Sequence, residues 1–162
     1  LDRVLWIPAG QPWQKARRIT PAAQREAMVR LAIVGEPRFM IERCELKRQG
    51  PSFTLDTVRE LRATKPGAEW FLIIGQDQYA NLHTWRDWRD LLALVTLAVA
   101  NRPGVIVEPH PDVQAAAQHV VPLPMLDIAS TDIRERVAAG QDIGTLVPAG
   151  VARYIEANHL YR

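Results

Sequence analysis

The chain has 162 residues, of which 48% are hydrophobic and 23% are charged, and its formal net charge is +2. This length and apolar content exclude a disordered chain and are typical of a domain with a buried core. The small net charge argues against a nucleic-acid partner, and no apolar run is long enough for a transmembrane helix. The only cysteine, Cys44, excludes an internal disulfide, so a reducing, cytoplasmic compartment is expected.

Short apolar runs alternate with helical patterns along the chain. Continuous runs of apolar, often β-branched residues predict buried parallel strands over Val4–Ile7, Trp70–Ile74 and Leu94–Ala100, with a further strand over Phe39–Cys44. Helices are predicted, in chain order, over residues 20–34, 54–65, 88–92, 130–138 and 148–158. The proline-rich stretch 102–124 is predicted to be a loop with one alanine-rich helix.

The first predicted helix begins with Thr20-Pro21, which suits an N-cap followed by proline at the first helical position. Its apolar positions predict one buried face, while Arg25, Glu26 and Arg30 are expected to face water. Strands and helices in alternation predict a doubly wound α/β fold with a parallel sheet. In such folds ligands bind at the carboxyl ends of the strands.

Polar residues that follow the predicted strands are therefore candidates for a site. Lys15, in the loop after the first strand, could bring a cation to a phosphate, although a solvated surface lysine is the simpler interpretation. Gly75 and Asp77 follow the strand at 70–74. A glycine there permits close backbone approach and an aspartate can accept from ribose hydroxyls, but a plain turn explains the pair equally well.

Two aromatic residues and a helix start form a second group of candidates. Trp88 is expected in the core, whereas Trp85 lies in the loop before a helix and has less reason to be buried. Its face suits a flat or cationic ring. Ser52 or Thr54 could simply cap the next helix, or the free N–H groups there could hold a small anion such as a carboxylate.

The most informative stretch surrounds Ser130 and Thr131 at the start of a predicted helix. Free N–H groups and the helix dipole favour phosphate at such a position. Arg134 lies one turn further on the same face and can reach the same anion. We therefore prefer a phosphate site here to an ordinary cap with a surface arginine.

The four histidines have no paired spacing and no second cysteine accompanies them, so no metal site is expected in the protein. Motifs for a nucleophilic serine, a P-loop or a dinucleotide-binding glycine loop are also missing. Covalent catalysis and zinc chemistry are accordingly not expected.

In their order and spacing, these stretches resemble the bacterial nicotinate-mononucleotide adenylyltransferases, which have a Rossmann-like nucleotidyltransferase fold. The resemblance covers nearly the whole chain. It is carried by Gly50-Pro51-Ser52-Phe53-Thr54, Ile73-Ile74-Gly75-Gln76-Asp77, Leu82-His83-Thr84-Trp85, Asn101-Arg102-Pro103-Gly104, Ser130-Thr131-Asp132-Ile133-Arg134 and Leu146-Val147-Pro148.

The resemblance implies transfer of the adenylyl group of ATP to nicotinate mononucleotide, which gives deamido-NAD and pyrophosphate with Mg²⁺ as cofactor. The phosphate of the mononucleotide would attack the α-phosphorus directly, without a covalent enzyme intermediate. Trp85 would stack on the nicotinate ring, and backbone N–H groups near Thr54 and Arg86 would hold its carboxylate.

The same resemblance assigns residues to ATP. Gly75, Asp77 and Arg102 would meet the nucleotide, and Ser130 and Thr131 would bind its phosphates. Arg134 and Lys15 would be the catalytic cations.

The sequence departs from the family at three places. The segment G-G-x-F-D-P-x-H-x-G-H, with its two catalytic histidines, is absent. The loop Pro-Pro-His-Lys reads Pro12-Trp13-Gln14-Lys15, and Ala129 stands where serine is common, which leaves Ser130 to cap the helix. We expect residues 1–162 to be a single nucleotidyltransferase domain that lacks its first strand, phosphate loop and first helix, with those histidines before Leu1.

Two alternatives remain at this point. One is a non-catalytic nucleotide-binding protein, and the other is a sister adenylyl- or cytidylyltransferase that acts on another phosphate acceptor. The sequence does not decide between acid and amide mononucleotides, and it does not indicate an oligomeric state.

Overall fold

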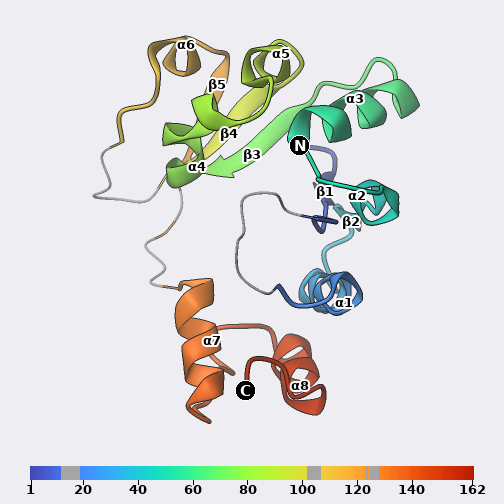
Figure 1. The fold of residues 1–162 in the computed structure, drawn as a ribbon, viewed down its shortest axis with the longest axis vertical. Coiled ribbons are helices and arrows are strands. Elements are labelled where there is room, and N and C mark those ends of the chain that lie inside the picture. Colours follow the sequence, from blue (N-terminus) through green and yellow to red (C-terminus); the bar gives the residue numbers. More distant parts are fainter. Residues whose placement is uncertain (12–18, 102–106, 123, 125–127) are drawn as a thin grey trace. The chain divides into compact units, whose positions relative to one another are not determined.

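The computed structural model describes residues 1–11, 19–101, 107–122, 124 and 128–162. The chain forms two compact units, one of residues 1–52 with 127–162 and the other of residues 53–126 (Figure 1). Among the described residues, no helix is both long and apolar enough to cross a membrane.

The first unit is built around a pair of parallel strands. Strand β1 (Val4–Trp6) pairs with β2 (Phe39–Ile41), with Val4 opposite Phe39, and α1 (Ala22–Ala32) lies between them in the chain. The short helix α2 (Cys44–Lys47) follows.

The C-terminal helices complete the first unit. Helices α7 (Ser130–Ala138) and α8 (Ala149–Ala157) have the bounds predicted for them to within a residue. Helix α8 packs against α1. Four buried residues form the core that the helices of this unit share: Ile143, Val151, Ile155 and Leu160. Partly buried residues, among them Met28 and Leu31 of α1, pack around this core.

The second unit is a three-stranded parallel sheet with helices packed on it. Its order is β3-β4-β5, formed by β3 (Phe71–Gly75), β4 (Thr96–Asn101) and β5 (Gln118–Pro122). The helical elements are α3 (Thr54–Thr64), α4 (Gln76–Ala80), η1 (Leu82–Thr84), α5 (Trp88–Leu92) and α6 (Pro111–Gln114).

The core of the second unit lies between one face of the sheet and these helices. Ile74, Leu97 and Val99 come from the strands, and Leu97 is 0% exposed. Leu55 of α3 and Leu91 of α5 pack in the same cluster. Parallel strands connected through helices confirm the predicted α/β class.

Several predictions about local structure were wrong. Residues 118–122 form strand β5, not a loop, and they pair with β4 from Leu97 opposite Gln118. Most of β5 is exposed, so it lacks the continuous apolar run of the other strands. In α1, Glu26 is buried rather than facing water, because it makes ion pairs of 2.6 Å to Arg30 and 3.1 Å to Arg43.

Candidate functional site

The start of α3 and the turn before α5 come together in the second unit. Phe53 is the N-cap residue of α3 and Thr54 is its first residue. The Arg86 guanidinium carbon lies 4.6 Å from the centre of the Phe53 ring. No side chain caps α3, so neither Ser52 nor Thr54 has the capping role considered for it. The structure thus places an exposed cation beside a helix start whose first N–H groups have no side-chain cap.

Trp85 precedes Arg86 and is more buried than the sequence suggested. Its ring is partly buried and packs against the core cluster of the second unit. The indole Nε1 atom is buried, and within the described part of the chain it has no hydrogen-bond partner. A buried donor without an acceptor costs about 1–3 kcal/mol. Trp85 therefore has a ring that packs against the core and a buried indole N–H without an acceptor among the described residues. Trp88 packs against the same core, as predicted.

Gly75 and Asp77 lie at the carboxyl end of β3. Gly75 is both the last residue of β3 and the N-cap residue of α4, and Asp77 is exposed in the first turn of that helix. A Cβ atom at Gly75 would meet nothing within 4 Å. The end of this strand is consequently open to an approaching group.

In the first unit, Ser130, Thr131 and Arg134 share the first turns of α7. The Arg134 Nη2 atom donates to the Thr131 hydroxyl at 3.1 Å, while Ser130 and Thr131 are both exposed. The prediction that Ser130 caps α7 was wrong, because Ala129 is the N-cap residue and no side chain bonds to the helix end. Thr131 and Arg134 thus lie together at a helix start that has no side-chain cap.

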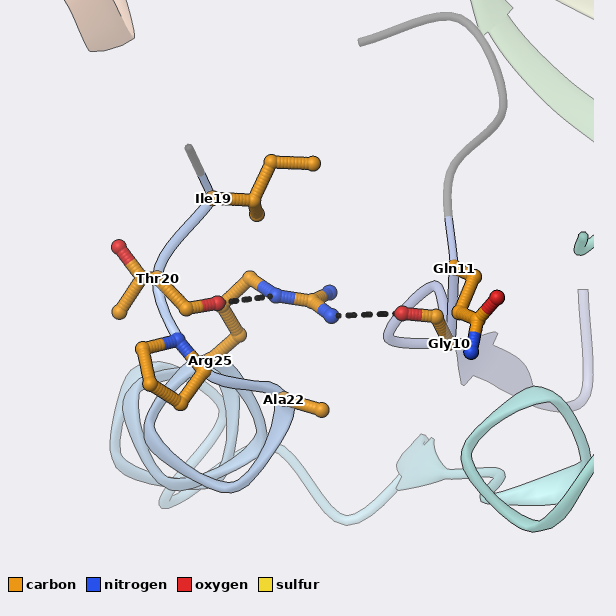
Figure 2. Close-up of a pocket in the computed structure, with 7 residues that line it drawn as sticks. Gly10, Gln11, Ile19, Thr20, Ala22 and Arg25 are labelled. Carbon is orange, nitrogen blue, oxygen red and sulfur yellow. Dashed lines mark hydrogen bonds between the residues drawn. The ribbon is translucent and has the colours of Figure 1, made fainter. Parts of the chain in front are cut away.

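A pocket of about 310 Å³ lies in the first unit between the loop after β1 and the start of α1 (Figure 2). Its lining includes Gly10, Thr20 and Arg25. Arg25 donates from Nε to the carbonyl of Thr20 at 3.0 Å and from Nη2 to the carbonyl of Gly10 at 3.2 Å. Burial is the main cause that lowers the pKa of Arg25 from its usual value.

Sequence reasoning missed Arg25, which was expected to face water. It also assigned the cap of α1 to Thr20, whereas Pro21 is the N-cap residue and no side chain caps the helix. The helical period places Arg25 on the polar side of α1, but it cannot show that a loop from another part of the chain folds over that side.

The predicted site residues fall in three places: outside the described residues, in the second unit and in the first unit. Lys15 and Arg102 lie outside the described residues. Thr54, Gly75, Asp77, Trp85 and Arg86 belong to the second unit, and Ser130, Thr131 and Arg134 to the first. Across the described ranges, no group of three or more His, Cys, Asp or Glu residues is arranged to hold a metal ion.

Comparison with known proteins identifies relatives along the whole chain. Residues 1–136 match the family described as cytidylyltransferase-like. A probable nicotinate-nucleotide adenylyltransferase of Methylibium petroleiphilum is 47% identical over 99% of this chain and 79% of its own length. Another, from Bordetella pertussis, is 42% identical over 100% of this chain and 84% of its own length.

Solved structures agree on the fold. The nicotinic acid mononucleotide adenylyltransferase of Plasmodium falciparum, complexed with NaAD, matches with a TM-score of 0.78 and 15% identity. The match covers 99% of this chain and 83% of that one. A putative nicotinate-nucleotide adenylyltransferase from Vibrio parahaemolyticus matches with a TM-score of 0.70 and 18% identity, over 99% of this chain and 79% of its own. The chain thus has the Rossmann-like fold of nucleotidyltransferases.

Proposed function

The chain belongs to the nicotinate-nucleotide adenylyltransferase family, and from that premise we propose that it transfers the adenylyl group of ATP to nicotinate mononucleotide. The products are deamido-NAD and pyrophosphate, so the reaction is a step of NAD biosynthesis. The observation that carries the assignment to this chain's own residues is the contact of Arg86, the residue after Trp85, with Phe53 at the uncapped start of α3, where Thr54 is the first helical residue.

The nicotinate group presents a flat cationic ring and a carboxylate. Trp85 offers a ring to stack on, because a partly buried indole is held in one orientation by the core behind it. The N–H groups of the first turn of α3 and the Arg86 guanidinium offer positive charge to the carboxylate. In this proposal, residues of the second unit bind both the cationic ring of nicotinate, through Trp85, and its carboxylate, through the start of α3 and Arg86.

ATP presents a nucleoside and a highly charged triphosphate. Gly75 and Asp77 stand at the open carboxyl end of β3, where α/β folds bind nucleotides. Ser130, Thr131 and Arg134 at the start of α7 supply hydroxyls, free N–H groups and a guanidinium for phosphate oxygens. The sequence resemblance implies an ATP-binding role for both sets of residues.

Mg²⁺ enters, in this proposal, bound to the phosphates of ATP as part of the substrate. Magnesium is commonly held by substrate phosphates with few protein ligands.

The reaction is a direct displacement at phosphorus. A phosphate oxygen of the mononucleotide forms a bond to the α-phosphorus of ATP, and the bond from that phosphorus to the bridging oxygen of the β-phosphate breaks, which releases pyrophosphate. The protein aligns the two substrates and neutralises charge, so no side chain forms a covalent bond. In this proposal Arg134, which donates to Thr131 at the start of α7, offsets charge that builds up on the phosphates.

Incubation of the full-length protein with ATP, Mg²⁺ and nicotinate mononucleotide tests the proposal. We expect pyrophosphate and deamido-NAD in equal amounts, and no pyrophosphate when the mononucleotide is omitted. The same assay with nicotinamide mononucleotide measures the preference for acid over amide. Turnover only with pantetheine phosphate, or only with CTP and choline phosphate, would support a sister transferase. Binding of ATP without turnover of any acceptor would support a non-catalytic nucleotide-binding protein.

A further inference from the structure

The guanidinium of Arg86 contacts both an aromatic ring and a carboxylate of the second unit. Its carbon lies 4.6 Å from the centre of the Phe53 ring, and its Nε atom lies 3.4 Å from Oδ2 of Asp87. Phe53 is the N-cap residue of α3, so the positive charge lies beside the start of that helix. Two neighbours of different chemistry therefore share one cation.

The ion pair between Arg86 and Asp87 is loose and exposed. Its 3.4 Å separation is longer than a strong charge-assisted hydrogen bond, and both side chains are more than half exposed. Within the described part of the chain, the Arg86 guanidinium donates no hydrogen bond. Because exposed pairs of this kind contribute little, another carboxylate can take the place of Asp87 at small cost.

Arg89, three residues further on, shows a firm pair of the same composition. Its guanidinium carbon lies 4.1 Å from the centre of the Trp88 ring, and it donates to the Asp112 carboxylate from Nε at 3.2 Å and from Nη2 at 2.8 Å. Each of the two arginines thus has one ring and one aspartate, but of these two only Arg89 is hydrogen-bonded to its aspartate. The donors of Arg86 are the ones that a ligand can use.

The backbone of Asp87 directs its carboxylate to Arg86 rather than to the helix that follows. Asp87 is the N-cap residue of α5, with φ 51° and ψ 38° in the left-handed region, and its side chain does not cap that helix. An N-cap aspartate ordinarily has extended backbone and accepts from amides of the first turn. Aspartate also tolerates the left-handed region better than most residues do. This turn therefore supplies Arg86 with a counter-ion from the next residue.

We propose that Asp87 is the resident counter-ion of Arg86 and that the carboxylate of nicotinate mononucleotide displaces it, while the Phe53 ring holds the guanidinium. A carboxylate fits the planar fork of a guanidinium, whereas the neutral amide of nicotinamide mononucleotide competes poorly with an aspartate for it. Arg86 is then a specificity-determining residue for acid over amide, and Phe53 and Asp87 are positioning residues that act through it. This inference rests on the proposed function.

The kinetics of the full-length protein with the acid and the amide mononucleotide test this exchange. Arg86→Gln removes the charge, so it should raise the KM for the acid at least tenfold and leave the KM for the amide nearly unchanged. Asp87→Asn removes the competing charge in a residue that also tolerates the left-handed region, so it should lower the KM for the acid about two- to fivefold. If the amide is not turned over, its inhibition constant against the acid replaces its KM.

The double variant separates displacement from simple repulsion. If Asp87 occupies the guanidinium, the gain from Asp87→Asn should be larger with Arg86 present than in the Arg86→Gln background, where only repulsion of the substrate carboxylate is relieved. The ring has its own test. Phe53→Leu should raise the KM for the acid about two- to fivefold, whereas Phe53→Tyr keeps a ring and should keep the wild-type value.

Arg89→Gln is the matched control, because Arg89 also has one ring and one aspartate but no proposed contact with substrate. Its kinetics with both mononucleotides should equal those of the wild type. If Asp87→Asn does not fold, Asp87→Gly completes the same cycle, since glycine adopts positive φ without strain.

The outcomes distinguish this inference from the proposed function. A wild-type protein that releases no pyrophosphate with either mononucleotide would contradict the proposed function, whatever the variants do. With an active wild type, an Arg86→Gln variant whose KM is unchanged for the acid, or rises equally for acid and amide, would overturn the specificity role. Equal gains from Asp87→Asn in both backgrounds would overturn the counter-ion role, and an unchanged KM in Phe53→Leu would overturn the role of the ring.

Discussion

Replacement of Trp85 by phenylalanine distinguishes a ligand-stacking indole from a core indole. The wild-type ring packs against the core of the second unit and buries an Nε1 atom that has no acceptor among the described residues. Phenylalanine keeps most of the packed ring and removes the unpaired donor, which costs about 1–3 kcal/mol when buried. The lost ring volume offsets part of that gain, so we expect a melting temperature equal to or above that of the wild type.

The affinity for nicotinate mononucleotide should fall in Trp85→Phe, even though the melting temperature should not. Stacking of an indole on a cationic ring contributes about 1–2 kcal/mol, and phenylalanine is a weaker cation–π partner. Trp85→Phe should therefore raise the KM for nicotinate mononucleotide a few-fold. Trp85→Ala removes all stacking and should raise it about 5–30-fold, since about 1.4 kcal/mol corresponds to a factor of ten.

Initial rates at varied mononucleotide concentration, together with thermal melts, measure both effects. Trp70→Phe is the matched control, because Trp70 is a partly buried tryptophan against the same core and has no proposed contact with substrate. It should leave KM unchanged. A KM for the mononucleotide that stays constant in both Trp85 variants, with a lower melting temperature in Trp85→Ala, would refute the stacking role and make Trp85 a core residue.

Three other residues give independent predictions. Arg134→Ala should raise the KM for ATP at least tenfold, because it removes a guanidinium from the start of α7, and normal ATP kinetics would exclude this contact. Leu97 lies in the central strand β4 and is 0% exposed, so Leu97→Ala should lower the free energy of unfolding, measured by urea denaturation, by about 2–5 kcal/mol. Val120 is 62% exposed, so Val120→Ala should change the free energy of unfolding little. Hydrogen bonds from Arg38 lower the pKa of the exposed Glu36 carboxyl. The ionised Glu36 side chain therefore adds a small amount to folding stability at pH values above the usual glutamate pKa, and this contribution is lost as the pH falls through the lowered pKa. An NMR titration of Arg38→Gln should show the Glu36 midpoint return to its usual range.

The sequence predicted the buried elements well because their patterns are local. Strand β4 and helices α3 and α8 have apolar runs or periods that the structure reproduces, with shifts of one or two residues at the ends. Strand β5 escaped prediction because it is largely exposed, and its pairing with β4 depends on residues about twenty positions earlier. A strand that is stabilised mainly by long-range hydrogen bonds leaves little trace in its own composition.

The candidate site was predicted in part for the same reason. Residue types at helix starts and strand ends indicated Thr54, Gly75 and Ser130, and the structure places each of them at such a position. The burial of Trp85 and the hydrogen bond from Arg25 to the Gly10 carbonyl depend on contacts between segments that are apart in the sequence. Neither follows from local spacing, so neither could be read from the sequence.

Helices α3 and α7 both begin without a side-chain cap, at Phe53 and Ala129 respectively. A capping serine or asparagine at either position would add about 1 kcal/mol to the stability of the unliganded protein, but its oxygen would occupy N–H groups that we assign to substrate anions. Because these caps are absent, the stability of the folded protein is expected to depend on whether substrate anions occupy the two helix starts. In the proposed function the substrate anions complete the two helix ends, so by thermodynamic linkage we expect the unliganded protein to be the less heat-resistant form of the molecule.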